Sequence, residues 1–382
     1  MRVLHVLASR SRSWGGPPMM VANLSRSLAQ LGIDSVILAL DRKSSPNVEF
    51  ADGVIVRSCG VAAISRMGIP ANSRIIGILT EEISNADVVH IHEIWHFPHV
   101  LAAVASHFAQ RRYILSPHGE IEPLYAGAHV AEKVLLWHLY QRRILNGASM
   151  VHALTAREER NVKLAGVKAP IRVVPNGVDV EIVDQLVRKS GVPDGRAGNE
   201  SVPYILYLGR IDPKKNIDVL LEAFSIVAKA TPEIQLVIAG PDPYKFWRRL
   251  SGIAAKLELG DRLQYLGFID ESLKFRLISN AKLFVLPSMA EGLSMAALEA
   301  LACRTPVVAS ETANLPEVQA ANAGRVVSPT PQNLAGAVLE ILEDDALRES
   351  MRSNARGLVE RVFSSTSMAR GMATLYRELL SQ

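Results

Sequence analysis

Residues 286–310 read LPSMAEGLSMAALEALACRTPVVAS, and this stretch indicates the fold of the chain. The apolar run that ends at Leu286 predicts a buried strand, and the residues from Gly292 onward predict a short turn followed by a helix. A second buried strand is predicted at Pro306–Ala309. Because parallel strands need a crossover connection, a strand, a helix and a strand in this order favour a parallel sheet covered by helices.

Two glutamates bracket the turn and the helix of this stretch. Glu291 falls just before the predicted helix and Glu299 lies inside it, so roughly 12 Å separates them at ~1.5 Å rise per residue. Between them, the backbone N–H groups of Gly292–Met295 form a helix start, which favours an anion such as a diphosphate. The segment would suit the sugar, diphosphate and ribose of a nucleotide-sugar. A helix-start glutamate and a solvated glutamate would explain the spacing equally well.

The alternation of apolar strands and helices continues on both sides of this stretch. It predicts an α/β chain of two doubly wound, Rossmann-like domains that face a central cleft. Residues 190–203 are rich in Gly, Pro and polar residues and show no periodicity, which is typical of a linker. We expect a first domain over residues 1–178, a linker over 179–202 and a second domain over 203–364.

The composition is typical of a soluble globular protein. The chain has 382 residues, of which 48% are hydrophobic and 21% are charged, and no apolar run reaches the roughly 18 residues of a membrane-spanning helix. The N-terminal sequence MRVLHVLASR has an apolar core too short for a signal peptide. Cys59 and Cys303 provide neither a disulfide framework nor a metal-binding spacing, so we expect a cytoplasmic location.

Positive charge is concentrated in the first half of the chain. Residues 1–178 contain 19 Lys and Arg against 13 Asp and Glu, whereas the net charge of the whole chain is +4. This imbalance favours an anionic acceptor or a peripheral contact with an anionic membrane, although an ordinary solvated surface would also explain it. The basic, apolar helix expected at Ala131–Leu145 could lie at a membrane interface, but core packing with an ordinary charged face is the favoured interpretation. No long Lys/Arg run is present, so no nucleic-acid partner is expected.

Several polar groups of the first half follow predicted strands, where open α/β sheets bind ligands. Gly15 and Gly16 lie between the first strand and the first helix, a position compatible with a phosphate but also with a tight turn. His92 follows the strand Asp87–Ile91, and His118 follows the next strand. A histidine at a strand end is well placed to donate a hydrogen bond to a substrate, and a satisfied loop histidine is the alternative.

A metal centre is the less favoured interpretation of the histidine-rich segment. Strand alternation places His90 and His92 on one face, and Glu93 and His96 follow them. No partner group shows a zinc-like spacing, so we prefer a substrate-facing loop to a metal site.

Two cations follow the first strand of the second half. Arg210 and Lys215 bracket a turn, after which Asn216 can cap a helix. The two cations can neutralise a diphosphate, whose negative charge grows when a sugar leaves it. Solvated loop cations are the alternative. That alternative weakens beside Glu291 and Glu299, because all four residues are expected at the carboxyl ends of strands of one sheet.

Together, these motifs resemble those of the retaining GT-B glycosyltransferases of family 4. The motifs are the Gly15-Gly16 loop, PNGVD at 175–179, GRIDPKKN at 209–216, LGFID at 266–270 and the stretch at 286–310. VVHIHEIW at 88–95 and SPHGEIEP at 116–123 are similar to the subset that builds bacterial exopolysaccharide or O-antigen. The resemblance covers nearly the whole chain.

The resemblance implies a role for each candidate residue of the second half. Glu291 would bind the hydroxyls of the donor sugar, and Glu299 would bind the ribose. Arg210 and Lys215 would hold the diphosphate. Four backbone groups would assist them, those of Gly292, Leu293, Ser294 and Met295.

The resemblance also implies contacts with the other parts of the donor. Gly15 and Gly16 would approach the donor phosphates, and His118 would sit against the donor sugar. Phe268 and Ile269 would flank the base, mainly through their backbone.

Some features depart from the family pattern or extend it. Leu293-Ser294 stands where Phe-Gly is common, Arg304 stands where glycine is frequent, and Thr312–Asn314 replaces a glycine-rich turn. The family's last helix returns to the first domain, so we expect Ser365–Gln382 to pack there.

The motifs and the resemblance therefore lead us to expect a metal-independent glycosyltransferase with a UDP- or GDP-sugar as donor substrate and no cofactor, and the resemblance implies that it retains the anomeric configuration. The expected acceptor is a lipid-linked glycan of cell-surface polysaccharide synthesis, at the inner face of the cytoplasmic membrane. A soluble acceptor such as a sugar phosphate, a UDP-sugar 2-epimerase on the same fold, and a non-catalytic nucleotide-sugar-binding protein are the alternatives.

Overall fold

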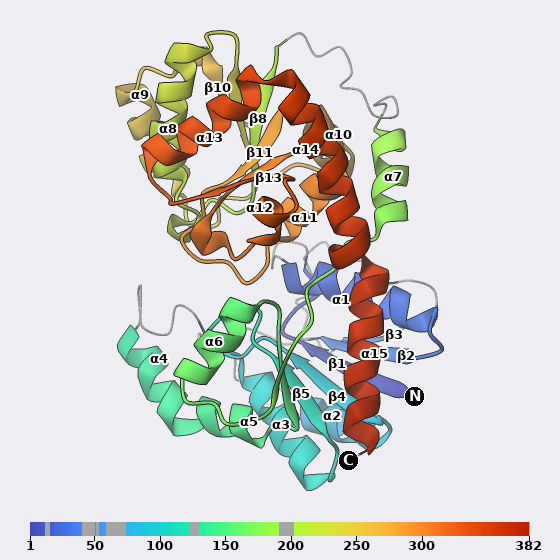
Figure 1. Cartoon of the computed structure of the whole chain (residues 1–382). Coiled ribbons are helices and arrows are strands. Elements are labelled where there is room, and N and C mark those ends of the chain that lie inside the picture. Colours follow the sequence, from blue (N-terminus) through green and yellow to red (C-terminus); the bar gives the residue numbers. More distant parts are fainter. Residues whose placement is uncertain are drawn as a thin grey trace. The chain divides into compact units, whose positions relative to one another are not determined.

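The computed structural model describes residues 1–11, 16–39, 50, 53–58, 74–121, 130–190 and 202–381. The chain divides into two compact units, the first formed by residues 1–177 and 365–382 and the second by residues 178–364. Each unit contains one parallel sheet with helices around it (Figure 1). The expected α/β class with two Rossmann-like domains is confirmed.

The first unit is built on a seven-stranded parallel sheet. Its strand order is β3-β2-β1-β4-β5-β6-β7, so the direction of winding reverses between β1 and β4. β4, β5 and β6 are buried along their whole length, which explains why they appear in the sequence as apolar runs rather than as an alternating pattern. The strands are β1 (Arg2–Leu7), β2 (Asp34–Ala39), β3 (Ile55–Ser58), β4 (Val88–His92), β5 (Tyr113–Ser116), β6 (Met150–Ala153) and β7 (Ile171–Val173).

The helices of the first unit include one interrupted element. The helix expected at Ala131–Leu145 consists of three consecutive segments, of which the middle one is a π-helix whose end residues Trp137 and Gln141 are both buried. The helices are α1 (Gly16–Ala29), α2 (Arg74–Ser84), α3 (Phe97–Phe108), α4 (Val130–Leu136), the π-helix η3 (Trp137–Gln141), α5 (Arg142–Gly147), α6 (Ala156–Leu164) and α15 (Ser365–Ser381).

The C-terminal helix α15 belongs to the first unit. It packs along α1 (Figure 1), and its buried Tyr376 forms a hydrogen bond with His90 of β4. Just before α15, Phe363 O accepts a hydrogen bond from Val178 N over 2.8 Å. The two points at which the chain passes from one unit to the other therefore lie side by side.

The expected linker at residues 179–202 is only partly a linker. Residues 180–189 form α7 (Val180–Lys189), which groups with the second unit and packs on α10 (Glu271–Asn280) and α11 (Met295–Ala302). Asp179 caps α7 by accepting a hydrogen bond from Ile182 N over 3.1 Å. The linker expectation was wrong for this segment. Asp179 is an N-cap residue, and the residues after it form an amphipathic helix.

The second unit is built on a six-stranded parallel sheet in the order β10-β9-β8-β11-β12-β13. Because β8 and β11 are neighbours, the loops that follow them meet at one edge of the sheet. The strands are β8 (Tyr204–Leu208), β9 (Gln235–Ala239), β10 (Leu263–Tyr265), β11 (Leu283–Leu286), β12 (Val307–Ser310) and β13 (Gly324–Val327). Besides α7, α10 and α11, the longer helices are α8 (Ile217–Ala230), α9 (Trp247–Lys256), α13 (Pro331–Glu343) and α14 (Asp345–Leu358).

Candidate functional site

The carboxyl ends of β8 and β11 bring a lysine and a glutamate into direct contact. Lys215 Nζ lies 2.5 Å from Glu291 Oε1, and Ser288 Oγ donates a hydrogen bond to the same oxygen over 2.7 Å. The side chains of the ion pair are only 19% and 10% exposed, so their attraction is less screened than at an open surface. The pair holds the Glu291 carboxylate in one position.

The loops after β8 and β11 are tied to each other by hydrogen bonds. Met289 N donates to Lys214 O over 2.8 Å, and Asn216 Nδ2 donates to Pro287 O over 3.2 Å. Asn216 adopts a φ of 56°, in the left-handed region that asparagine tolerates better than most residues. Its side chain makes no capping bond to α8. Asn216 therefore occupies the expected N-cap position, but its side-chain amide joins the two loops instead of capping the helix.

The backbone around Glu291 is also held by the segment after β12. Ser310 Oγ and Thr312 Oγ1 both donate to Ser288 O, over 2.5 and 2.6 Å. Asn314 Nδ2 donates to Glu291 O. The segment that departs from the family's glycine-rich turn therefore supports Glu291 directly.

Glu299 is paired with a lysine that sequence analysis did not single out. Lys274 Nζ of α10 lies 2.7 Å from Glu299 Oε1 of α11, and the side chains are 16% and 11% exposed. The Lys274 ammonium also lies 4.4 Å from the centroid of the Phe275 ring. The two ion-pair partners are 25 residues apart on separate helices, so no local pattern relates them. A carboxylate held in this way can accept hydrogen bonds from two ribose hydroxyls.

The N-terminus of α11 adds partial positive charge near these carboxylates. Ser294 is its N-cap and accepts a hydrogen bond from Ala297 N over 3.4 Å. Leu293 is buried, whereas Gly292 and Met295 are half-buried. The first amides of the helix therefore lie where a helix start favours an anion.

Arg210 follows β8 with an exposed side chain. Its backbone is held by Tyr207 OH, which donates to Arg210 O over 3.1 Å. Burial, followed by the charges of Glu291 and Asp212, raises the pKa of Tyr207 well above its ordinary value. Tyr207 therefore remains a neutral hydrogen-bond donor, and the exposed guanidinium is accessible to an anion.

Phe268 and Ile269 lie in the turn after β10. Phe268 is 61% exposed and Ile269 is half-buried. The turn is packed against the loop after β9, because Gly240 N donates to Gly267 O over 2.7 Å. An exposed aromatic ring on a fixed turn is suited to contact with a planar base.

A chain of hydrogen bonds runs through the first sheet. At one end, Tyr376 OH lies 2.8 Å from His90 Nδ1, and His90 Nε2 lies 2.7 Å from Ser116 Oγ. The chain continues from Ser116 Oγ to His152 Nδ1 over 2.7 Å, and it ends with His152 Nε2 at 2.7 Å from Val174 O. Burial lowers the pKa of His152 to about 4 and that of His90 well below 6.5, so both are neutral. Because a carbonyl oxygen only accepts, His152 donates to it, and every bond back to the Tyr376 hydroxyl then has a fixed direction.

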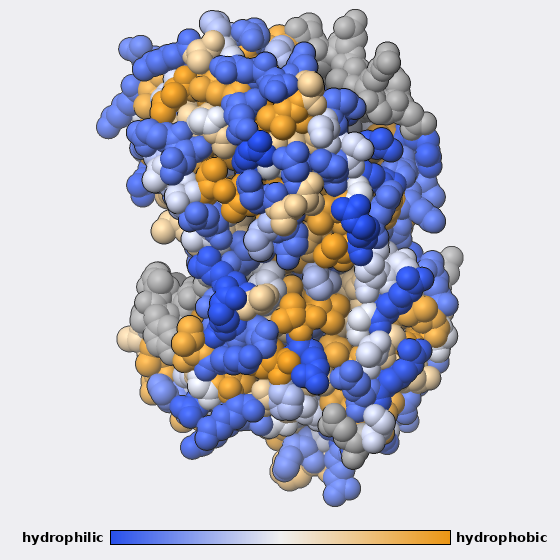
Figure 2. Space-filling view, in the orientation of Figure 1, coloured by the Kyte–Doolittle hydropathy of each residue, from blue (hydrophilic) through white to orange (hydrophobic). Residues whose placement is uncertain are grey.

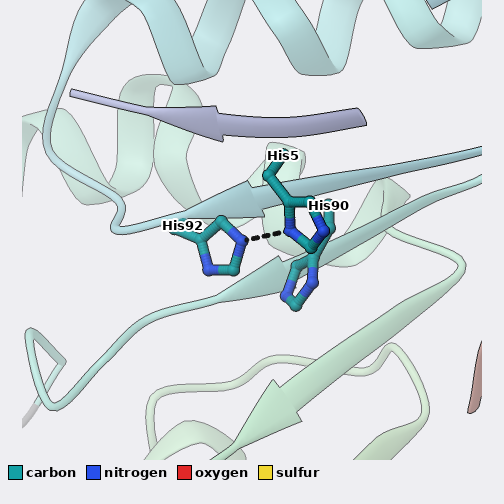
Figure 3. Close-up of side chains that lie close together, drawn as sticks. All are labelled: His5, His90 and His92. Atoms are coloured by element: carbon teal, nitrogen blue, oxygen red, sulfur yellow. Dashed lines mark hydrogen bonds between the residues drawn. The ribbon is translucent and has the colours of Figure 1, made fainter. Parts of the chain in front are cut away.

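A second line of imidazoles leads to His118. His5 Nδ1 lies 3.0 Å from His92 Nε2, and His92 Nδ1 lies 3.1 Å from His118 Nε2. Figure 3 shows the first of these bonds, with the His90 ring beside it. His5 and His92 are fully buried, and His118 is half-buried. His92 was expected to face a substrate, but both of its ring nitrogens are used by other histidines, so it supports His118 instead.

The residues considered for a metal site do not come together as one group in the described part of the chain. Among the described residues, potential ligand atoms within 4.8 Å of one another form two groups, one of His5, His90 and His92 and one of Glu93, His96 and Glu120. In the first group, His90 accepts at Nδ1 and donates at Nε2. It therefore has no lone pair to offer a cation as it stands.

Of the two glycines expected at the phosphates, only Gly16 is among the described residues. Gly16 is the first residue of α1, and Gly15 lies outside the described residues. The role expected for the two glycines therefore stays a prediction.

Two family models match the chain, one in each half. The model described as Glycosyltransferase Family 4 matches residues 14–182. The model described as Glycosyl transferases group 1 matches residues 194–358.

Curated relatives are similar to the chain over different lengths. The alpha-D-kanosaminyltransferase of Streptomyces kanamyceticus is 33% identical over 187 residues, and the O-antigen chain mannosyltransferase B of Escherichia coli is 37% identical over 163 residues. These matches span just under half of each chain, 48% and 41% of this chain and the same shares of the two relatives. The phosphatidyl-myo-inositol mannosyltransferase of Mycolicibacterium smegmatis is 28% identical over 361 residues, which are 91% of this chain and 86% of that relative.

Solved structures share the fold of the whole chain. The sucrose-phosphate synthase of Thermosynechococcus elongatus superposes with a TM-score of 0.76 at 22% identity and covers 100% of this chain and 99% of its own. HepE of Anabaena, in complex with UDP and glucose, has a TM-score of 0.76 at 17% identity and covers 99% and 100%. One glycosyltransferase domain model thus matches each half of the chain, and the whole chain has the two-domain GT-B fold of these solved structures.

Proposed function

We propose that the chain is a retaining glycosyltransferase that moves a sugar from a nucleoside-diphosphate sugar to an acceptor hydroxyl. The observation that carries this proposal is the ion pair of Lys215 and Glu291 beside the N-terminus of α11. An ammonium and a helix start favour a diphosphate, and a carboxylate accepts hydrogen bonds from sugar hydroxyls. We assign the second carboxylate, Glu299 with its partner Lys274, to the ribose.

The proposed reaction relies on charge stabilisation of the leaving group. Negative charge grows on the bridging oxygen of the diphosphate as its bond to the sugar breaks, and we assign Arg210, Lys215 and the first amides of α11 to stabilise it. The departing phosphate oxygen takes the proton of the acceptor hydroxyl while the new bond forms on the same face of the sugar. This route retains the anomeric configuration and uses no divalent metal. We assign His118 to a hydrogen bond with the transferred sugar.

The two residues of the ion pair provide the test of this function. Glu291→Ala and Lys215→Ala are each expected to lower transfer by about 10²–10³-fold, because each removes a contact that stabilises the transition state. Lys229→Ala, at the exposed end of α8, is the matched control and should keep full activity. The assay follows product formation from labelled UDP- and GDP-sugars with lipid-linked and sugar-phosphate acceptors, and circular dichroism checks folding.

The outcomes of this assay separate the alternatives. Near-normal turnover by folded Glu291→Ala protein would refute the assignment. Conversion of a UDP-sugar in the absence of any acceptor would identify the 2-epimerase alternative. Donor binding without turnover by the wild-type protein would identify a nucleotide-sugar-binding protein.

We propose a lipid-linked glycan as the acceptor, with a peripheral contact to an anionic membrane. None of the described helices is long and apolar enough to cross a membrane, and Figure 2 shows apolar and hydrophilic residues interspersed over one face of the molecule. Leu135 and Leu139 lie four residues apart and are 65% and 59% exposed, and the exposed Arg143 follows them. Exposed leucines next to a cation are typical of a helix at a membrane interface. The names of the O-antigen and phosphatidyl-myo-inositol mannosyltransferases among the relatives support this choice.

Vesicle sedimentation distinguishes this acceptor from a soluble sugar phosphate. The chain is expected to sediment with vesicles that contain phosphatidylglycerol, less so at high salt, and less so after the double substitution Leu135→Ser/Leu139→Ser. Equal recovery with pure phosphatidylcholine, anionic vesicles and no vesicles would favour the sugar phosphate.

A further inference from the structure

The line of imidazoles that ends at His118 connects three neighbouring strands of the first sheet. His5 lies on β1, His92 ends β4, and His118 lies in the turn after β5. The rings of His5 and His92 are stacked with centroids 5.3 Å apart, and those of His92 and His118 with centroids 5.4 Å apart. Figure 3 shows that His5 and His92 point toward each other from adjacent strands.

All three imidazoles are neutral at physiological pH. Burial lowers the pKa of His5 and His118 to about 3 and that of His92 well below 6.5. A neutral imidazole has one N–H and one lone pair. Since His92 makes one bond with each neighbour, it must accept one and donate the other. The two bonds therefore point the same way, either toward His118 or toward His5.

The buried end of the line decides between the two directions. His5 Nε2 is fully buried and has no hydrogen-bond partner among the described residues. If the bonds point toward His5, this nitrogen carries an N–H with no acceptor. If they point toward His118, it carries only a lone pair. Buried donors without an acceptor are rarer in proteins than acceptors with an unused lone pair. The bonds therefore run from His5 to His92 and from His92 to His118.

The turn that carries His118 is held independently of the imidazoles. His118 has a φ of 53° and Gly119 a φ of 80°, and a non-glycine residue in this region costs on the order of 1 kcal/mol or more. Glu158, which is buried, stabilises the turn by accepting hydrogen bonds from Gly119 N over 2.5 Å and from Leu154 N over 2.6 Å. Glu158 thus positions the backbone next to His118, whereas His92 positions its ring.

We propose that His5 and His92 are positioning residues that hold His118 as the Nδ1–H tautomer, so that its ring is a hydrogen-bond donor and not a base. His118 Nε2 accepts the bond from His92, and Nδ1 carries the proton. The described residues provide no partner for Nδ1. The ring is thereby suited to an oxygen acceptor, such as a sugar hydroxyl or a phosphate oxygen. The identity of this ligand rests on the function proposed above, whereas the tautomer does not.

Nitrogen NMR of the full chain with labelled histidine tests the tautomer directly. At pH 7.5, the His118 signals, assigned by their loss in His118→Ala, are expected to show the proton on Nδ1. Since His92→Leu removes the donor that keeps the proton off Nε2, it is expected to add the Nε2–H form to the His118 signals. His92→Asn keeps an amide donor near the position of Nδ1 and is expected to retain the wild-type tautomer. His138→Asn, at an exposed site on η3, is the control and should change nothing.

The NMR results test the tautomer, whereas the transfer assay tests the proposed function, so the two can fail separately. A proton on His118 Nε2 in the wild-type protein overturns it, and this result does not depend on whether any variant folds. An unchanged tautomer in folded His92→Leu overturns it as well. In the transfer assay, His92→Leu is expected to lower kcat by about tenfold or more with little change in donor KM, and His92→Asn to restore most of it. If the tautomer is as expected but the wild-type protein transfers no sugar, the proposed function fails and the inference stands.

Discussion

Glu299 and Lys274 illustrate how single residues set the properties of the candidate site. Their side chains are 11% and 16% exposed and form an ion pair at 2.7 Å. Lys274→Met leaves the carboxylate without its cation, and we expect a loss of stability below the roughly 3–5 kcal/mol of a fully buried pair, because some water reaches the site. Lys274→Met/Glu299→Gln should regain most of this stability without regaining donor affinity.

Urea unfolding and donor titration of the single and double variants measure the two effects. They form a double-mutant cycle, so the coupling between the side chains is obtained directly. If Lys274→Met alone is as stable as the wild-type protein, the pair does not contribute as we describe.

At the residue scale, the groups that belong to a sequence motif were predictable, whereas those that make contacts across the fold were not. Lys215 and Glu291 were both predicted, although their direct contact was not. Lys274 was missed because its contact depends on the packing of two helices. Asn216 was predicted to cap α8, but its amide bonds Pro287 O instead. A side chain at a helix start has several partners within reach, and only the folded loops decide among them.

At the scale of elements, the close packing of the loops after β8 and β9 depends on one glycine. Gly240 has a φ of 141°, and a Cβ at this position would lie 1.9 Å from Gly209 O. Gly240→Ala must therefore move one loop, and we expect a loss of stability of about 2 kcal/mol or more. Gly252, inside α9, has nothing within 4 Å of an added Cβ. Gly252→Ala should therefore stabilise the protein by about 0.5–1 kcal/mol.

Urea denaturation of the two alanine variants compares the positions in one experiment. We expect changes of opposite sign in the free energy of unfolding. Because both substitutions add the same methyl group, this difference would be due to the backbone contact at Gly240. Similar effects of the two substitutions would mean that the loops accommodate a side chain at residue 240.

The elements themselves were predictable where burial produces a strong pattern. The parallel strands appear as short apolar runs because both of their faces are covered. Helix α7 was missed, and the start of α9 at Trp247 was not predictable from the apolar pattern. In the second case, Asp242 accepts hydrogen bonds from Phe246 N and Trp247 N over 2.8 and 2.9 Å, so a local cap rather than the apolar pattern decides where the helix begins.

At the scale of the whole molecule, the two units differ in their histidine content. All 10 histidines lie at or before His152, so the second unit, residues 178–364, has none. Burial lowers the pKa of His5 and His118 to about 3 and that of His152 to about 4, whereas an unfolded histidine titrates near pH ~6.5. Between these values the unfolded first unit binds more protons than the folded one. The contribution of these neutral histidines to the free energy of unfolding is therefore at its maximum above pH ~6.5, and it is lost as the pH falls toward 4.

We therefore expect the first unit to lose more stability than the second between pH 7.5 and pH 5. Pulse-labelling hydrogen exchange at increasing urea, read by mass spectrometry, assigns unfolding to peptides of each unit. The second unit is an internal control, because it contains no histidine. An equal decline in both units would contradict the assignment of neutral, buried histidines.

The central claim is that the second unit binds a nucleoside-diphosphate sugar through Lys215, Glu291 and Glu299. Isothermal titration of the full chain with UDP-, GDP- and ADP-sugars tests it most directly. We predict saturable binding of one of these donors, weakened by about tenfold or more in Lys215→Ala and in Glu299→Ala, since each loses a charged contact. The affinity should be unchanged in Lys229→Ala. Binding of none of these donors, or the same affinity in all three variants, would contradict the account.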